Sequence, residues 1–211
     1  MAIHANTKLV MRRGASLPHW TMDGAIYAVT FRLADSLPGT VLRELREQRN
    51  ELVRSTGGRN LSAAEEQRLR SRSAMKIEAS LDLGIGQCRM SSDIIARLIA
   101  DAIQKFDSDR YRLFAWCVMP NHVHAVIQPL ARNELPQILH SWKSFTASSA
   151  NRLLNRGGPF WQVEYYDHLI RDEDDLNHAV EYVLSNPAKA GLCDWKLVGT
   201  GKDSVLLSGP A

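Results

Sequence analysis

The chain has 211 residues, of which 45% are hydrophobic and 23% are charged, a composition typical of a globular protein with one sizeable core. Its 26 Lys and Arg against 23 Asp and Glu give a formal net charge of +3, which permits a polyanionic partner without requiring one. No stretch approaches the roughly 18 apolar residues of a membrane helix, and three scattered cysteines form neither a disulfide framework nor a C-x-x-C metal knuckle. We therefore expect a reduced, cytoplasmic protein that does not interact with membranes.

The N-terminal part opens with a basic segment, which is followed by a core strand. Residues 1–22 carry Lys8, Arg12 and Arg13 near a His-Trp pair, a mixture suited to phosphate attraction and base stacking. Residues 25–34, AIYAVTFRLA, are rich in aromatic and β-branched side chains and lie between turn residues. This pattern predicts a buried strand.

Two helices are predicted next. From Pro38 to about Val53 apolar residues recur at helical spacing, and a glycine pair then ends the helix. A second helix is predicted to begin at Ser62, where an S-x-x-E sequence forms a capping pattern. Its middle is heavily charged and offers few apolar anchors, so we interpret residues at about 55–80 as a helical insertion.

The rest of the chain alternates strands and helices. Only Pro120 and Asn121 separate two predicted strands, which implies that these strands pair antiparallel. Without the insertion, the order is strand, helix, strand, strand, helix, strand and a terminal helix, which predicts an α+β, ferredoxin-like βαββαβ antiparallel sheet with added helices. The predicted ranges are about 93–103 for the first helix, 111–119 and 122–128 for the paired strands, 135–154 for the second helix, 163–170 for the last strand, and 173–185 for a final helix that ends at Asn186-Pro187. We assign residues 23–195 to one domain and 196–211 to a C-terminal tail.

Two histidines interrupt the second of the paired strands. His122 and His124 are two residues apart, so their side chains project from one face with Cβ atoms about 6 to 7 Å apart. Two imidazoles in this position can share a divalent metal, although a bare H-x-H also occurs as a structural pair. Asn186, Gln128 and many carboxylates are available as further ligands. Asn186 follows Tyr182 by four residues, which puts a phenol and a potential metal ligand on one helix face, a pairing suited to attack on a phosphate. A tyrosine at this position also occurs as a half-buried aromatic of an amphipathic helix.

A set of ordered motifs resembles the single-tyrosine HUH transposases, and most closely the REP-associated tyrosine transposases. The strongest are FAWCVMPNHVHAVIQP and WQVEYYDHLIRDEDDLNHAVEYVLSNPAKAGL, and AIYAVTFRLADSLP, LDLGIGQC and HSWKSFTASSANRLL extend the resemblance over most of residues 15–192. The resemblance implies that His122 and His124 are the HUH metal ligands, that Asn186 is the third ligand, and that Tyr182 is the catalytic nucleophile.

Three other tyrosines compete for the nucleophilic role. Tyr165 and Tyr166 lie in a predicted strand, and Tyr111 begins another. Tyr182 ranks first because it alone shares a predicted helix face with a potential metal ligand.

The resemblance also implies an activity and its partners. The protein is expected to nick single-stranded DNA near REP-like hairpins with Mg²⁺ or Mn²⁺, and to rejoin it through a 5′-phosphotyrosine linkage that leaves a free 3′-hydroxyl. It is expected to act as a monomer or homodimer associated with the bacterial nucleoid. The residues predicted to contact DNA are Lys143, Arg12, Arg13, Gln162 and Arg171. The alternatives are a solvated helix face for Lys143, a mobile tail for Arg12 and Arg13, and a structural role for Gln162 and Arg171.

Two other classes of protein fit parts of the sequence. H-x-H on a strand also opens the metal site of metal-dependent amidohydrolases, but those barrels need more alternating strands and helices than this chain provides. A non-catalytic ferredoxin-like nucleic-acid-binding protein would leave the retained tyrosine and ligands unexplained, and the aromatic signature of an RRM is missing. The serine-rich WSS segment common near the C-terminus of the resembled family is also unclear here, which puts C-terminal DNA contacts in doubt.

Overall fold

A five-stranded antiparallel sheet is central to the structure, a computed structural model that describes residues 10–13, 18–22, 24–57, 59 and 61–202. Its strands, in the order in which they lie side by side, are β6 (Tyr166–Leu169), β3 (Tyr27–Arg32), β5 (His122–Pro129), β4 (Tyr111–Val118) and β7 (Val198–Thr200). All neighbours pair antiparallel. The order β6-β3-β5-β4 is that of a ferredoxin-like sheet, so the predicted fold class is confirmed.

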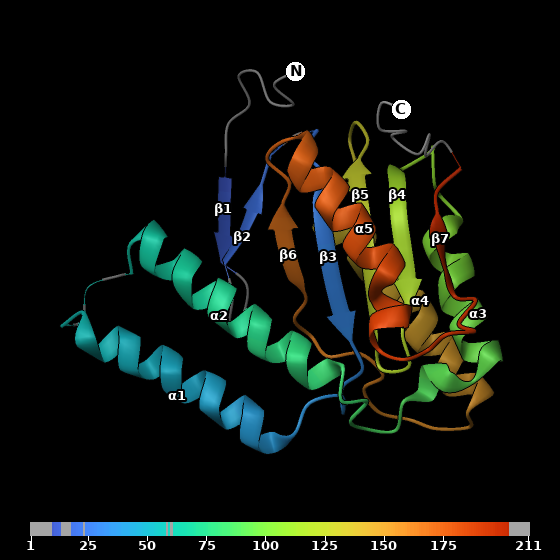
Figure 1. Cartoon of the computed structure of the whole chain (residues 1–211), viewed down its shortest axis with the longest axis horizontal. Helices are drawn as coiled ribbons and strands as arrows, with labels where there is room; N and C mark the ends of the chain where they lie inside the picture. Colours follow the sequence, from blue (N-terminus) through green and yellow to red (C-terminus); the bar gives the residue numbers. More distant parts are fainter. Residues whose placement is uncertain (1–9, 14–17, 23, 58, 60, 203–211) are drawn as a thin grey trace.

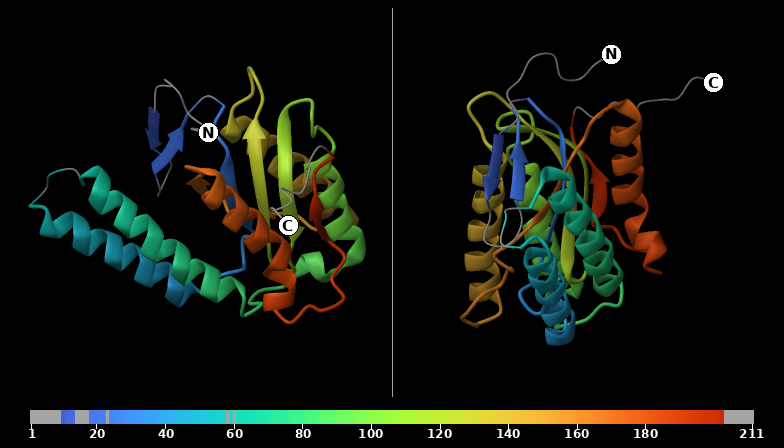
Figure 2. Two further views of the ribbon diagram at one scale, coloured as in Figure 1. Left: turned by 45° about the horizontal axis from the view of Figure 1, so that its top comes forward. Right: turned by 90° about the vertical axis from the view of Figure 1, so that its left-hand side faces the viewer.

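Helices cover both faces of this sheet. Helices α3 (Asp93–Gln104) and α4 (Leu135–Leu153) cover one face, and α5 (Glu173–Lys189) crosses the other (Figure 2). Side chains alternate between the faces along a strand. Val123, Ala125 and Ile127 of β5 therefore belong to the large core cluster that contains α3 and α4, whereas Val126 packs in the cluster of α5.

Two long helices project from one side of the sheet as a hairpin, which we call the arm (residues 39–81; Figure 1). It consists of α1 (Gly39–Ser55) and α2 (Ala63–Leu81), and the predicted capping box is present at Ser62. Both predicted helices are thus confirmed. None of the described side chains of α1 is buried, but α2 ends at Leu81, which is 1% exposed. The arm is therefore attached to the domain through the C-terminal end of α2.

Helix α5 continues beyond its predicted end. The expected stop at Asn186-Pro187 is wrong, because Pro187 lies inside the helix, which ends at Lys189. Pro187 has no N–H to donate, and its ring crowds the carbonyl one turn earlier, but it lies in the last turn of the helix, where it is buried. Asn186 therefore lies within the helix, one turn after Tyr182.

Three further elements had no counterpart in the sequence predictions. A two-stranded hairpin of β1 (Val10–Arg13) and β2 (Pro18–Thr21) lies in the predicted N-terminal segment, and a 3-10 turn, η1 (Arg89–Ser91), precedes α3. Strand β7 lies in the predicted tail and pairs with β4. Lys8 and the last part of the predicted tail, residues 203–211, lie outside the described residues. No described helix combines the length and the apolar character needed to span a membrane.

Candidate active site and metal centre

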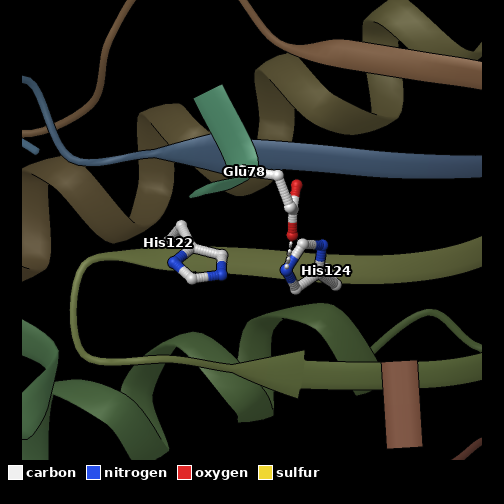
Figure 3. A group of neighbouring side chains, drawn as sticks. All are labelled: Glu78, His122 and His124. Carbon is white, nitrogen blue, oxygen red and sulfur yellow. Dashed lines mark ion pairs between the residues drawn. The ribbon is translucent and has the colours of Figure 1, made fainter. Parts of the chain in front are cut away.

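The two histidines of the H-x-H motif lie on the face of β5 that is covered by α5. His122 and His124 are 1% and 2% exposed, and their ring centroids are 4.6 Å apart in a T-shaped arrangement. Figure 3 shows both rings projecting from the same strand, as the two-residue spacing requires. Burial of two imidazoles costs free energy unless their nitrogens find partners, so each nitrogen has to be accounted for.

His122 is oriented by the residue before it. The Asn121 side-chain amide donates to the backbone carbonyls of Leu81 and Ile85, at 3.1 and 3.3 Å, which leaves Oδ1 as an acceptor. His122 Nδ1 lies 2.7 Å from this Oδ1, so Nδ1 carries the hydrogen. Burial and the neighbouring His124 lower the pKa of His122 well below its usual range. His122 is therefore neutral, and Nε2 is left with a free lone pair, as a metal ligand requires.

His124 lies between a threonine of the sheet and a glutamate of the arm. Its Nδ1 is 2.8 Å from Thr30 Oγ1 on the neighbouring strand, and its Nε2 is 3.3 Å from Glu78 Oε1. This last pair lies within ion-pair distance but does not meet hydrogen-bond geometry. Burial alone would raise the pKa of Glu78, but contact with His124 and the hydrogen bond from the Tyr182 hydroxyl lower it to about 2. Glu78 is thus a carboxylate in this site.

Tyr182 reaches the same site from α5. Its ring packs edge-on against the ring of His124, with centroids 5.5 Å apart, and its hydroxyl donates a hydrogen bond to Glu78 Oε1. Burial, and then the hydrogen bond to Glu78 and its charge, raise the pKa of this phenol far above its usual range. The Lys189 ammonium lies 4.9 Å from the centre of the Tyr182 ring, within the range of a cation–π contact.

Three buried atoms in this region have no hydrogen-bond partner among the described residues: His122 Nε2, His124 Nε2 and Asn186 Oδ1. They belong to the three predicted metal ligands. Asn186 is 3% exposed, and its amide acts on the Tyr182 hydroxyl by lowering the pKa of the phenol. Buried acceptors without partners are rare in folded proteins, and two imidazoles with an amide oxygen form a donor set suited to a divalent ion. The residues therefore fit a metal such as Mg²⁺ or Mn²⁺.

The competing tyrosines are separated from this site to different degrees. Tyr111 is buried in the core on the opposite face, and its hydroxyl donates to Ile103 O at 2.6 Å. Tyr165 also packs against that core. Tyr166 pairs in register with Thr30, so it projects from the face of the histidines, but β3 separates its strand from β5. Tyr182 is the tyrosine that contacts His124 and Glu78 directly.

Other predicted site residues lie elsewhere. The Lys143 ammonium donates to the carbonyls of Gln162 and Val163 at 2.7 and 2.6 Å, so the chain itself occupies two of its hydrogens. Arg171 lies 3.8 Å from Asp175, and the Gln128 amide donates to Gly24 O. These contacts are structural, and the DNA contacts predicted for Lys143, Gln162 and Arg171 remain predictions. Arg12 and Arg13 lie on β1, away from the five-stranded sheet's ladder.

Two residues of the site, and a buried arginine in register with His122, were not singled out from the sequence. Glu78 lies in the stretch interpreted as a charged helical insertion, just before the motif LDLGIGQC, which carries part of the family resemblance. Asn121 was treated only as a turn residue. Arg32 is in register with His122, 8% exposed, and donates to Ser36 Oγ at 3.3 Å. Phe31 and Leu33, on either side of Arg32, belong to the core. In the sequence, Arg32 is therefore read as part of an apolar strand.

Comparison with known proteins gives consistent matches. The family described as "Transposase IS200 like" matches residues 89–186, which include both histidines, Tyr182 and Asn186. The REP-associated tyrosine transposase of Escherichia coli K12 is 28% identical over 106 residues, 47% of this chain and 61% of that protein. A Haemophilus influenzae protein assigned provisionally to the same group is 30% identical over 92 residues, 38% of this chain and 52% of that protein. The resemblance read from the motifs is confirmed.

A structural comparison matches a REP-associated tyrosine transposase bound to a REP hairpin. It has a TM-score of 0.49 and 17% sequence identity, and it covers 85% of this chain and 79% of that chain. The two sequence relatives are matched over between about half and three fifths of their own length.

Proposed function

The chain is a relative of the IS200-like transposases, and we propose that it cleaves and rejoins single-stranded DNA with Tyr182 as nucleophile. One observation carries the proposal: the ring of Tyr182 packs edge-on against His124, a buried histidine whose Nε2 has no hydrogen-bond partner. A phenol and a free ligand atom side by side are what metal-assisted attack on a phosphodiester requires.

His122, His124 and Asn186 would hold a divalent ion, Mg²⁺ or Mn²⁺. When bound, this ion would neutralise charge on the oxygens of the scissile phosphate. The Asn121 hydrogen bond keeps His122 in the tautomer that presents Nε2, and Thr30 holds the ring of His124. The ligands are thus oriented before DNA arrives, which lowers the cost of assembling the site.

The covalent step exchanges one phosphodiester bond for another. The oxygen of Tyr182 attacks phosphorus, a tyrosyl O–P bond forms, and the P–O3′ bond breaks. The departing oxygen ends as a 3′-hydroxyl that carries the proton given up by the phenol, and the 5′-phosphate remains on Tyr182. No water is consumed, so the same step in reverse joins a 3′-hydroxyl to the held strand.

The proposed partner is a single strand that carries a REP-like hairpin. The ordered motifs imply such a substrate, and the similar Escherichia coli protein is named for its association with REP elements. The proposed DNA contacts are Lys143, Arg12, Arg13, Gln162 and Arg171, together with Lys189 beside the nucleophile.

A covalent-adduct assay tests the activity. Oligonucleotides with a hairpin flanked by single strands, labelled at the 3′ end, are incubated with the protein and Mn²⁺ and then run on a denaturing gel. The 3′ label should move with the wild-type protein, because the downstream fragment carries the 5′-phosphotyrosine. Tyr182→Phe should give no such band, and Tyr166→Phe should behave like the wild type.

Two results would count against the proposal. An adduct that persists in Tyr182→Phe and disappears in Tyr166→Phe would move the nucleophile to β6. Hairpin binding in a native gel without an adduct, across a library of flanking sequences, would favour the non-catalytic DNA-binding protein.

A further inference from the structure

We infer that Glu78 is a ligand of the same divalent ion, so that the arm contributes directly to the active site. The inference rests on the proposed function, because it adds an acidic ligand to the site formed by His122 and His124. It also assigns a role to the arm, part of which the sequence analysis interprets only as a charged helical insertion.

The geometry places the three ligand atoms around one point. One atom from each of Glu78, His122 and His124 lies within 4.8 Å of the others. Ligands about 2.1 Å from an octahedral ion are about 3 to 4.2 Å from one another, so the present spacing is of the same order. Figure 3 shows the Glu78 carboxylate pointing from α2 toward His124.

A carboxylate completes the chemistry of the proposed ligand set. Two neutral imidazoles and an amide bring no charge to a divalent ion, whereas Mg²⁺ and Mn²⁺ favour carboxylate oxygens. The Glu78 side chain is 28% exposed, and its hydrogen-bonded oxygen faces the buried His124. Among the His, Cys, Asp and Glu of the described residues, Glu78 is the acidic member of the cluster with the H-x-H motif.

The position of Glu78 is fixed by the end of the arm. Leu81, one turn later on α2, is 1% exposed, and its carbonyl accepts a hydrogen bond from Asn121. Asn121 is also the residue that orients His122. The same side chain therefore fixes a histidine ligand and the helix that carries Glu78, which links the placement of the carboxylate to that of the histidines.

Glu78 also contacts the nucleophile. The Tyr182 hydroxyl donates to Glu78 Oε1, the oxygen that faces His124 Nε2. A carboxylate in this place holds the phenol oxygen beside the ligand set, within the region where a scissile phosphate would bind. Glu78 lies on α2, and its Oε1 contacts both His124 of β5 and Tyr182 of α5.

Binding of Mn²⁺ to the full chain tests the inference without DNA. Isothermal titration calorimetry gives the dissociation constant, and the relaxation of water protons gives the number of water molecules that remain on the bound ion. Glu78→Gln should weaken Mn²⁺ binding at least about tenfold and Glu78→Ala should leave one additional water on the ion. Glu51→Gln, an exposed carboxylate of α1 in the same arm, is the matched control and should bind like the wild type.

The outcomes separate this inference from the proposed function. Unchanged Mn²⁺ affinity in Glu78→Gln, or weaker binding with an unchanged water count in Glu78→Ala, would overturn the ligand role. If His124→Ala also binds like the wild type, the metal site of the proposed function fails as well. Should both Glu78 variants be insoluble, Glu78→Asp keeps the charge with a shorter reach, and wild-type affinity together with a wild-type water count would again contradict direct ligation by Glu78.

Discussion

The Tyr182 hydroxyl donates a hydrogen bond to the Glu78 carboxylate, which joins the proposed nucleophile to the arm. Burial of the phenol and the negative charge of Glu78 both oppose formation of phenolate. In the protein without metal, Tyr182 is therefore expected to stay protonated at pH values well above about 10, the usual pKa of a tyrosine.

A difference titration checks this state. The ultraviolet absorbance of phenolate in wild type minus Tyr182→Phe, in the presence of a chelator, should show no ionisation up to about pH 10. Glu78→Gln should move the Tyr182 pKa downward, because a neutral amide replaces the charge. A wild-type phenolate signal from Tyr182 below pH 10 would contradict the described contact.

Asn121 is predicted to stabilise the fold as well as the site. Asn121→Ala leaves His122 Nδ1 and the carbonyls of Leu81 and Ile85 without their partner, so it should reduce the free energy of unfolding by about 1 to 3 kcal/mol. Urea denaturation measures the loss. Asn50→Ala, at an exposed position of α1, should change it by less than about 0.5 kcal/mol.

Lys143 gives the protein a distinct response to alkaline pH. Burial lowers the Lys143 pKa from 10.5 to about 8, so between these values the unfolded chain binds a proton that the folded chain has released. The free energy of unfolding, compared with that of Lys143→Met, should therefore increase as the pH rises from about 8 to 10.5. A difference between the wild type and Lys143→Met that stays flat over this pH range would refute the assignment.

Gly201 is predicted to be required for docking of the chain after β7. A Cβ atom at this position would lie 2.1 Å from Leu113 O and 2.7 Å from Asp107 Oδ2, and the first of these is backbone that cannot rotate away. Gly201→Ala should lower the free energy of unfolding by about 1 to 3 kcal/mol in chemical denaturation. Gly157→Ala, whose Cβ meets nothing within 4 Å, should be nearly neutral.

The parts of the fold with local signals were predictable from the sequence. The capping box at Ser62 and the short Pro120-Asn121 connection are patterns of adjacent residues, and both are present as expected. The end of α5 at Pro187 was predicted wrongly, because Pro187 lies buried inside the helix, which ends at Lys189. Strand β7 was missed since its pairing with β4 depends on residues about 80 positions away.

The residues of the site also divide into those with a local sequence signal and those without one. His122 and His124 were found because they are two residues apart on one strand, and Tyr182 and Asn186 because they are four apart on one helix. Glu78 belongs to neither pattern. A charged residue on an amphipathic helix looks the same in sequence whether it faces water or a site, and only the docking of α2 brings Glu78 beside His124.

The position of β5 inside the sheet determines which parts of the site can move. Its backbone is paired with β3 and β4, and His124 has a register partner on each side, Thr30 and Cys117. The histidines cannot shift without breaking two ladders, so the strand is the stationary half of the site. Glu78 and Tyr182 lie on helices, α2 and α5, that do not join the ladders of this sheet. For the proposed DNA substrate, a rearrangement that opens the site would move α2 or α5, with the histidines of β5 as the fixed reference.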